Sequence, residues 1–323
     1  MQPEHAGRKQ PQREGLRSPY IWLVAAPLFW SGNMVFGRVL AQAVPPFGLS
    51  AVRWLVSTLV LAAFTLHAHG RIPWPRGQAW WPVAMMAISG VAGFTPVVYL
   101  ALHSVGSVEA SLIQSSTPVF ALLLALLFTG EGLGWHKALG ALLTILGVAA
   151  IVSHGGLQRL LHLQWGRGDT LMLLAAFLWA VYTVAARPAA RWLSPLAATL
   201  HSAWLGLLLL LPLAAWEWLA GAPWRLSVAA WTGVAYVSVF PSAVAFLAWN
   251  YGVSRIGAGR ASVFNNLLPL FTAVWAVLLL GEPVGPAEAL GGLLILAGVS
   301  LVVTRHPAAA NRDTMQQTAA SRA

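Results

Sequence analysis

The sequence has no cysteine and few charged residues, and each shortage excludes a class of protein. Without cysteine there are no disulfide bonds, no thiol catalysis and no thiolate metal ligands. Only 9% of the 323 residues are charged and 58% are hydrophobic, whereas soluble domains carry about 25% charged residues. We therefore expect the chain to lie in a lipid bilayer. Its length holds about ten membrane-crossing helices, which excludes catalysis in a separate aqueous domain.

Acidic residues are also scarcer than basic ones, with 9 against 19 and a formal net charge of +10. In a soluble protein this balance would suggest nucleic acid, but here most basic residues stand at the ends of apolar runs, where they orient helices. We expect no nucleic-acid partner. Cytoplasmic loops are enriched in Lys and Arg, and placing the N-terminus inside puts 14 of the 19 on that side. An inner-membrane protein with both termini cytoplasmic is predicted.

Apolar segments of membrane-crossing length follow one another along the whole chain. Prolines and glycines separate several of them, for example Pro45-Pro46 before the second segment. The predicted helices lie at 20–40, 45–67, 79–102, 107–129, 136–154, 169–187, 195–219, 227–253, 258–280 and 285–303.

The strongest signal in the sequence is an internal repeat. A slide of 151 positions aligns 106–152 with 257–303 without a gap, and 18 of the 47 pairs are identical, against about one in ten expected by chance. A slide of 149 positions aligns earlier segments of the two halves. The matched positions are Pro118 with Pro269, Gly140 with Gly291, Gly147 with Gly298, Trp30 with Trp179, Arg38 with Arg187, and Pro46 with Pro195.

The repeat predicts an all-α polytopic membrane protein of ten transmembrane helices, built as two inverted five-helix repeats. Because five is odd, the second half must enter the membrane from the opposite side, and this symmetry suits alternating access. The predicted organisation is a cytoplasmic N-terminal tail (1–19), a first repeat (20–154), a linker (155–168), a second repeat (169–303) and a cytoplasmic C-terminal tail (304–323).

Several motifs carry a resemblance to a known family. They are the Trp-containing first helix of each half, the run from Pro46 to Arg53, and an Ala-Ser to Pro to Gly-Glu run at 110–131 that recurs at 261–282. In order, spacing and duplication they resemble the EamA family of the drug/metabolite transporter (DMT) superfamily. One departure is Glu109, whose repeat mate Arg260 has the opposite charge.

The resemblance implies a secondary transporter that moves a small organic metabolite or drug-like solute, outward in our interpretation, by rocking of the two halves. It also implies a central cavity lined mainly by helices 1, 3, 4, 6, 8 and 9. The expected partners are a small-molecule substrate and the lipid bilayer, and either a monomer or a homodimer would fit. The alternative from another class is an intramembrane enzyme acting on a lipid-soluble substrate, which should show clustered His, Asp and Glu or a nucleophile at one depth. The sequence shows no such cluster, metal-ligand set or phosphate loop, so no cofactor is expected.

Two helices of the predicted bundle carry matching polar stripes, at 111–118 and at 262–269, with side chains at i, i+3, i+4 and i+7. Polar residues at membrane depth face protein or water rather than lipid. One interpretation is interhelical hydrogen bonding, worth about 0.6 kcal/mol for each bond, and it is favoured for the single serines. For the pair Asn265 and Asn266, which have several amide donors and acceptors, a cavity is favoured.

Other helices add candidates at helical spacing, from both halves of the chain. Most of the 17 Trp are expected in interfacial belts, but Trp30 and Trp179 lie near mid-helix and are repeat mates. The predicted substrate-binding residues are Asn265, Asn266, Gln114, Ser115, Trp30, Asn33, Tyr99, Trp179, Tyr182, Asn250 and Arg53.

Charged and titratable residues in the apolar segments are few. Arg53 has two interpretations that the sequence leaves open: its guanidinium binds an anionic substrate, or it snorkels to the membrane interface. Glu131 and Glu282 are expected to bond to the start of the next helix, and Glu109 to act as a helix cap. His103 is interpreted as a packed neutral histidine rather than a proton relay.

Overall fold

A computed structural model describes residues 18–129, 135–153, 166–225, 227–256, 261 and 263–303. Within these residues every regular element is helical, which confirms the predicted all-α class. Seven helical segments are long and apolar enough to cross a membrane, and three further apolar helices, 138–151, 264–280 and 286–301, are shorter. Residues 1–17 and 304–323 of the predicted tails, most of the linker, and the residues Glu131, Arg260 and Ser262 lie outside the described residues.

The helices fall close to the predicted segments. The first half holds α1 (Pro19–Ala41), α2 (Pro46–His69), the short η2 (Gly77–Ala79), α3 (Trp80–Met86), the π-helical η3 (Ala87–Gly93), α4 (Phe94–Leu102), α5 (Ser107–Gln114), α6 (Thr117–Thr129) and α7 (Trp135–Val152). The second half holds α9 (Arg167–Ala189), α10 (Pro195–Leu219), α11 (Val228–Val239), the π-helical η4 (Phe240–Val244), α12 (Ala245–Ile256), the 3₁₀-helical η5 (Val263–Asn266), α14 (Leu267–Leu280) and α15 (Pro286–Val303).

Proline and glycine set several helix ends. Proline stands in the first turn of α1, α2 and α10, where its missing N–H costs nothing. Gly70 and Gly281 follow α2 and α14 with a φ of 65°, a left-handed conformation that glycine adopts without strain.

The predicted segment 107–129 contains one candidate membrane span, Ser107–Leu124, but it is not a continuous helix, because a turn at Ser115 and Ser116 separates α5 from α6. The reason is Pro118, which has no N–H for the carbonyl of Gln114. The hydroxyl of Thr117 donates to that carbonyl instead, at 2.7 Å. In the second half, the 3₁₀ turn η5 precedes Pro269 in the same way. Both polar stripes therefore lie at breaks in helical geometry.

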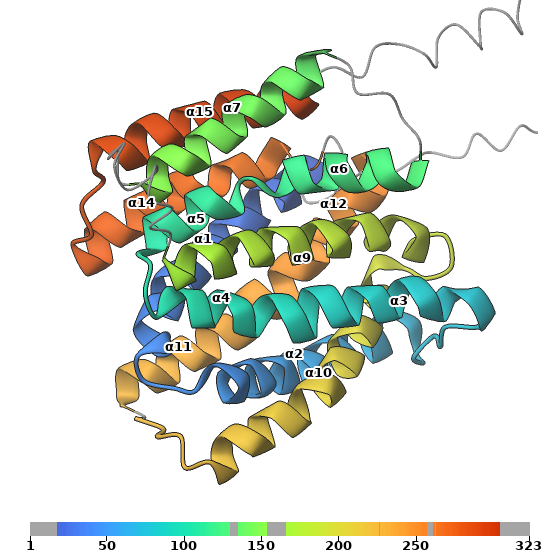
Figure 1. Ribbon diagram of the computed structural model, residues 1–323. Coiled ribbons are helices and arrows are strands. Elements are labelled where there is room, and N and C mark those ends of the chain that lie inside the picture. Colours follow the sequence, from blue (N-terminus) through green and yellow to red (C-terminus); the bar gives the residue numbers. More distant parts are fainter. Residues whose placement is uncertain are drawn as a thin grey trace, which may run out of the picture.

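The helices lie roughly side by side and run from one side of Figure 1 to the other, with α7 and α15 along the top and α10 and α11 toward the bottom. Helix α1 packs against α12 and α14, and its repeat counterpart α9 packs against α4, α5 and α6. The contacts of α2 with η4 and of α10 with η3 form a second such pair. Segments from the two halves thus interdigitate and do not form two separate bundles.

Helices α7 and α15 meet along glycines. A Cβ atom built on Gly147 would lie 2.6 Å from the carbonyl oxygen of Gly291, and the reverse holds for Gly291 and the carbonyl oxygen of Gly147. Gly298 contacts Gly140 further along the same two helices. These pairs exchange with each other under the 151-residue slide. Small residues permit this close approach of two helix backbones in a membrane.

Candidate functional site

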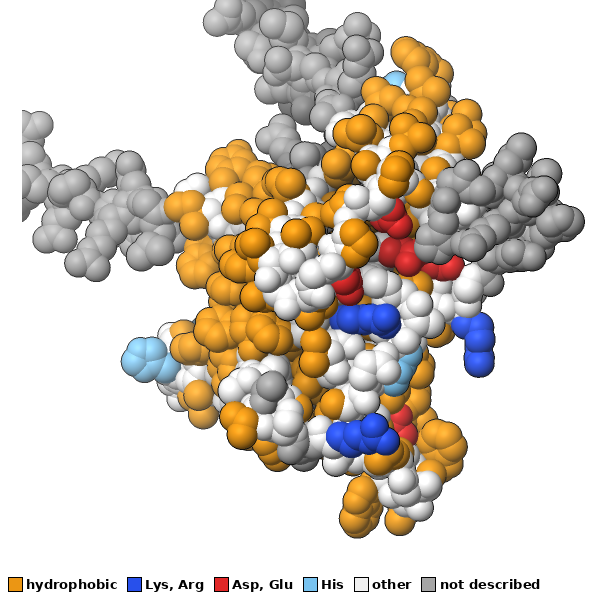
Figure 2. Space-filling model, turned by 90° about the vertical axis from the view of Figure 1, so that its left-hand side faces the viewer, with side chains coloured by type: hydrophobic (Ala, Val, Ile, Leu, Met, Phe, Trp, Pro, Cys, Tyr) orange, Lys and Arg blue, Asp and Glu red, His pale blue; other side chains and the backbone are white. Residues whose placement is uncertain are grey.

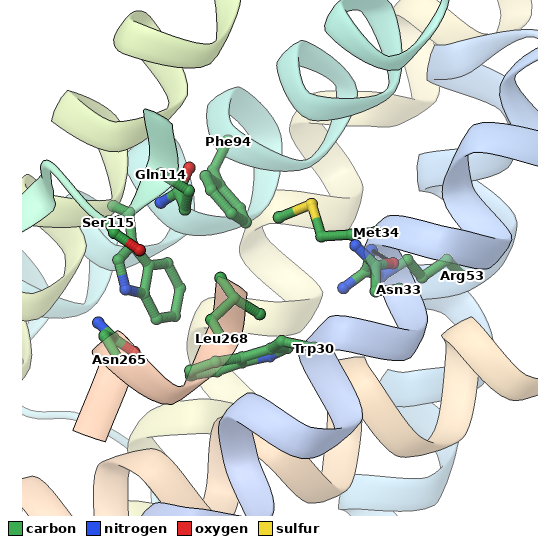
Figure 3. A pocket seen from close by; sticks show the side chains of 10 residues that line it. Trp30, Asn33, Met34, Arg53, Phe94, Gln114, Ser115, Asn265 and Leu268 are labelled. Atoms are coloured by element: carbon green, nitrogen blue, oxygen red, sulfur yellow. Dashed lines mark hydrogen bonds between the residues drawn. The ribbon is translucent and has the colours of Figure 1, made fainter. Parts of the chain in front are cut away.

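A pocket lies inside the bundle, between α1, α2, α4, α5, α9 and the segment that joins η5 to α14 (Figure 3). Seven of the predicted substrate-binding residues line it. Its volume of about 20 Å³ holds about one or two waters. The lining residues are Trp30, Asn33, Met34, Arg53, Phe94, Gln114, Ser115, Trp179, Asn265 and Leu268.

Arg53 is the charged residue of this pocket, and its side chain is only 1% exposed. The guanidinium donates from Nη1 to Asn33 Oδ1 and to the Tyr99 hydroxyl, both at 2.8 Å. It donates from Nε to the Ser242 hydroxyl. A buried guanidinium held by interior side chains does not reach the membrane interface, so the snorkelling interpretation is wrong.

The partners of Arg53 form a directed network. The Tyr99 hydroxyl accepts from Arg53 and donates to Asn33 Oδ1 at 3.0 Å. The Ser242 hydroxyl accepts from Arg53 and donates to the carbonyl of Val237 at 2.6 Å. All these partners are neutral, and within the described part of the chain no carboxylate pairs with the guanidinium. Two N–H groups, those of Nη2, also donate to no described residue, although a guanidinium has five.

Polar groups on the far side of the pocket come from the two helix breaks. In Figure 3, Arg53 and Asn33 lie on one side, and Gln114, Ser115 and Asn265 lie on the other. The Gln114 amide donates to the Thr117 hydroxyl at 3.2 Å, while its buried Oε1 has no hydrogen-bond partner. The Asn265 side chain makes no hydrogen bond to any described residue. Among the described residues, the pocket therefore presents the Nη2 donors at one side, and the Gln114 Oε1 acceptor and the Asn265 amide at the other.

Aromatic rings line the pocket between these two sides and form one of its walls. Trp30 and Trp179, the repeat mates, meet edge to face with ring centroids 5.0 Å apart. Both are buried, at 8% and 4% exposure, so neither belongs to an interfacial belt. Trp30 Nε1 donates to the carbonyl of Pro241 in η4 at 3.0 Å. Phe246 packs against Trp179 at 5.2 Å.

Four predicted residues lie outside the pocket lining. Tyr99 contacts the pocket through Arg53. Tyr182 stacks on Trp179 at 4.7 Å and accepts a hydrogen bond from Asn250 at 2.7 Å, which places this pair behind the aromatic wall. Asn266 is partly buried and its Oδ1 has no partner. The structure thus separates Asn265, which lines the pocket, from Asn266, which does not.

The sequence interpretation missed the apolar lining residues Met34, Phe94 and Leu268, and also Ser242. They carry no signal that distinguishes them from other core residues, although Phe94 and Leu268 adjoin predicted polar positions. The interpretation of His103 as a packed histidine is wrong, because His103 lies exposed after the end of α4.

A different histidine, His201 in α10, is packed. Trp204 Nε1 donates to its Nδ1 at 2.8 Å, so His201 Nε2 carries the proton and donates to the carbonyl of Pro73 at 2.8 Å. This pairing attaches the connection between α2 and α3 to α10.

The described carboxylates gather at one end of the bundle, where α2, α5, α9 and α15 begin, and Figure 2 shows acidic side chains near the centre of this face. Three of them cap helix starts, where the helix dipole favours an anion. Glu217 accepts from the Gly48 N–H at 2.7 Å, and Asp169 accepts from the Gly166 N–H at 3.0 Å.

Glu282 accepts from both the N–H and the hydroxyl of Ser107, at 2.9 and 3.2 Å. The prediction that Glu282 bonds to the start of the next helix is therefore wrong. Because α14 packs against α5, Glu282, which follows α14, lies at the start of α5 in the other half. Glu109 lies in the first turn of α5, as a cap-like role requires.

The family model described as the EamA-like transporter family matches the chain twice, over residues 17–153 and 166–304. The chain belongs to this family. It is similar to a probable terminal-alkyne amino-acid exporter of Streptantibioticus cattleyicolor, with 31% identity over 89% of this chain and 94% of the relative. It is also similar to an uncharacterized transporter of Archaeoglobus fulgidus, with 29% identity over 89% and 98%.

A solved crystal structure shares the fold, with a TM-score of 0.62 and 23% identity over 89% of this chain and 97% of the other. The chain belongs to the EamA-like family, and relatives named as transporters match it over nearly their whole length. It is therefore a membrane-embedded transporter of a small molecule. The alternative of an intramembrane enzyme is wrong.

Proposed function

We propose that this transporter exports a small zwitterionic organic solute, an amino acid or a close analogue, across the cytoplasmic membrane by alternating access. The observation that carries the proposal is Arg53. Its guanidinium is buried on the pocket wall, has only neutral partners among the described residues, and keeps two N–H groups unused.

A buried cation without a counterion is costly in a membrane protein, where intramembrane charges typically mark substrate pathways. A carboxylate in the pocket would accept from the Nη2 donors and neutralise the charge. Hydrogen bonds between a guanidinium and a carboxylate are short and strong, and their planar geometry orients the bound group. Arg53 therefore supports a solute with a carboxylate.

The opposite side of the pocket supports a cationic or donor group on the same solute. Gln114 Oε1 is a buried acceptor without a partner, and Asn265 adds a second amide on that side. An ammonium group has three donors and no acceptor. A solute with both groups would use the two sides at once, and the amino-acid exporter among the relatives is consistent with this class.

The proposed layout is ten transmembrane helices in two inverted five-helix repeats, 20–154 and 169–303, joined by the linker 155–168. The paired contacts of α1 and α9, and the glycine pairs between α7 and α15, support it. The proposed orientation puts both termini in the cytoplasm, and the end with the described carboxylates outside. In this conformation the pocket is too narrow for an organic solute, so binding requires the helices around it to move apart.

The proposed substrate class predicts a clear order of uptake into proteoliposomes. L-leucine should be transported, whereas 3-methylbutylamine, which lacks the carboxylate, and 4-methylpentanoate, which lacks the amine, should be transported at least about tenfold more slowly. The reason is that each analogue leaves one side of the pocket unpaired, at about 1–3 kcal/mol. Counterflow of radiolabelled solutes measures this order. Equal rates for the amine and for L-leucine would contradict a role of Arg53 in carboxylate binding.

The adjacent asparagines offer a matched pair for testing the pocket. Asn265→Ala should lower transport per folded molecule by about tenfold, because it removes a pocket amide that a bound solute would use. Asn266→Ala should lower it much less, because Asn266 lies outside the lining. Transport divided by the amount of monodisperse protein measures both. Equal losses in the two variants would mean that the helix break, and not the pocket amide, is what matters.

A further inference from the structure

A second, larger cavity lies at the end of the bundle where α9 ends and α10 begins. Its volume is about 290 Å³, against about 20 Å³ for the central pocket. We call it the vestibule. Its lining includes Arg187, Arg191, Asn250 and Val253.

The vestibule carries two cations that the central site does not use. Arg187 lies in the last turn of α9, Arg191 lies in the turn that follows the helix, and both line the vestibule. Both are exposed, and neither donates a hydrogen bond to any residue in the described part of the chain. Asp169 lies at the opposite end of the same helix, as do the other described carboxylates. The vestibule therefore has a positive charge that a solute can approach.

Asn250 supplies a buried acceptor to the same cavity. Its amide nitrogen donates to the Tyr182 and Thr199 hydroxyls, both at 2.7 Å. Because the Thr199 hydroxyl donates to the carbonyl of Pro195, it must accept from Asn250, which fixes the orientation of the amide. Asn250 is 5% exposed, and its Oδ1 has no partner. A ligand with an N–H donor would satisfy this oxygen.

A chain of three side chains connects the vestibule to the central pocket. Asn250 lines the vestibule and bonds to Tyr182, Tyr182 stacks on Trp179, and Trp179 lines the central pocket. The stacked rings are 4.7 Å apart and tilted by only 12°. A solute that leaves the vestibule would meet the central site directly behind these two rings.

The two ends of the bundle differ in a way that leaves the vestibule open. Arg38, the repeat mate of Arg187, donates from Nη1 to the carbonyl of Leu102 at the far end. The 151-residue slide places Val253 at the position of Leu102, and Val253 lines the vestibule. Arg187 makes no such bond there. The hydrogen bond between Arg38 and Leu102 at one end thus has no counterpart between Arg187 and Val253 at the other.

We infer that the vestibule is a loading site for the zwitterionic solute, with its carboxylate held at Arg187 and Arg191 and its ammonium group at Asn250 Oδ1. This inference rests on the proposed function. From this site the solute passes the Tyr182 and Trp179 rings to reach Arg53. The ligand class follows from the chemistry of the vestibule: two exposed guanidinium groups and one buried acceptor.

The first test is transport of L-leucine by Arg187→Gln/Arg191→Gln. When L-leucine is supplied from the vestibule side, the KM of this variant should be roughly tenfold higher than that of the wild type, because the charged partners of the carboxylate are lost. The maximal rate should stay near that of the wild type, because the central site is intact. The matched control is Arg255→Gln, which removes an exposed arginine from the same end of the bundle; that guanidinium packs on the Tyr251 ring, outside the vestibule lining. An unchanged KM in the double variant, or an equal rise in the control, would overturn the loading site.

The second test separates this inference from the proposed function. Arg53→Met should lose central binding but keep a weak site for L-leucine, measured by saturation-transfer NMR, and the site should disappear when Arg187→Gln/Arg191→Gln is added. If Arg53→Met binds no L-leucine while the wild type does, the vestibule inference fails and the proposed function stands. If the wild type itself binds no L-leucine, both fail.

Discussion

Replacing Arg53 with methionine should strongly reduce carboxylate transport while leaving the folded protein at least as stable as the wild type. The loss of transport follows from the Nη2 donors, which are the charged donors that the pocket offers. A hydrogen bond to a charged group contributes about 1.5–3 kcal/mol, so its loss should weaken solute binding by about 10- to 150-fold.

The expected stability follows from the network around the guanidinium. Without Arg53, the Tyr99 hydroxyl still donates to Asn33, and the Ser242 hydroxyl still donates to the carbonyl of Val237. Each partner keeps one hydrogen bond, and a buried cation that costs several kcal/mol is removed. A residue that lowers stability in order to serve function is common at active sites. Arg53 should be such a residue.

Thermal unfolding in detergent and counterflow of L-leucine together measure both halves of this prediction. The control is Ser57→Ala, one helical turn further along α2, because Ser57 is fully buried, has no hydrogen-bond partner and lies outside the pocket. It should change neither quantity. A clear drop in the unfolding temperature of Arg53→Met, with transport falling only in proportion to folded protein, would show that Arg53 holds helices together.

The apolar segments, and the prolines and glycines between them, were sufficient to predict where most helices lie. The segment 195–219 coincides with α10, and 20–40 differs from α1 by one residue at each end. The reason is that length and apolarity of a membrane helix are local properties. The π-helical stretches η3 and η4 were not predicted, because a register change within a helix leaves no hydrophobic signature.

The candidate site could be predicted by residue type but not by partner. The repeat indicated that Trp30 and Trp179 face a shared interior, and they are in contact. That Arg53 is held by Ser242, 189 residues away, depends on how η4 packs against α2. The separation of Asn265 from Asn266 likewise depends on the 3₁₀ geometry of η5, whereas an ideal α-helix was assumed. Tertiary packing decided both.

The hydrogen bond between Arg38 and the carbonyl of Leu102 gives the second large expected effect, a shift between the two access states. Arg38 donates to the carbonyl of Leu102 at the end that we propose faces outward, and its repeat mate Arg187 has no such bond at the inner end. Alternating access by an inverted repeat exchanges the conformations of its two halves. In the outward-open state we therefore expect Arg187 to donate to the carbonyl of Val253, and Arg38 to be released.

Arg38→Gln should then shift the transporter toward the outward-open state by about tenfold or more, because it removes one charge-assisted hydrogen bond from the closed outer end. The chain has no cysteine, so a single Met34→Cys, on the lining of the central pocket, reports access by its reaction rate with an impermeant thiol reagent added outside. Arg38→Gln should raise that rate by about the same factor. Arg167→Gln, an exposed arginine at the start of α9 on the same face, is the control and should leave the rate unchanged. Equal rates in both variants would mean that Arg38 only caps the end of α4, and that the outer end is closed by packing alone.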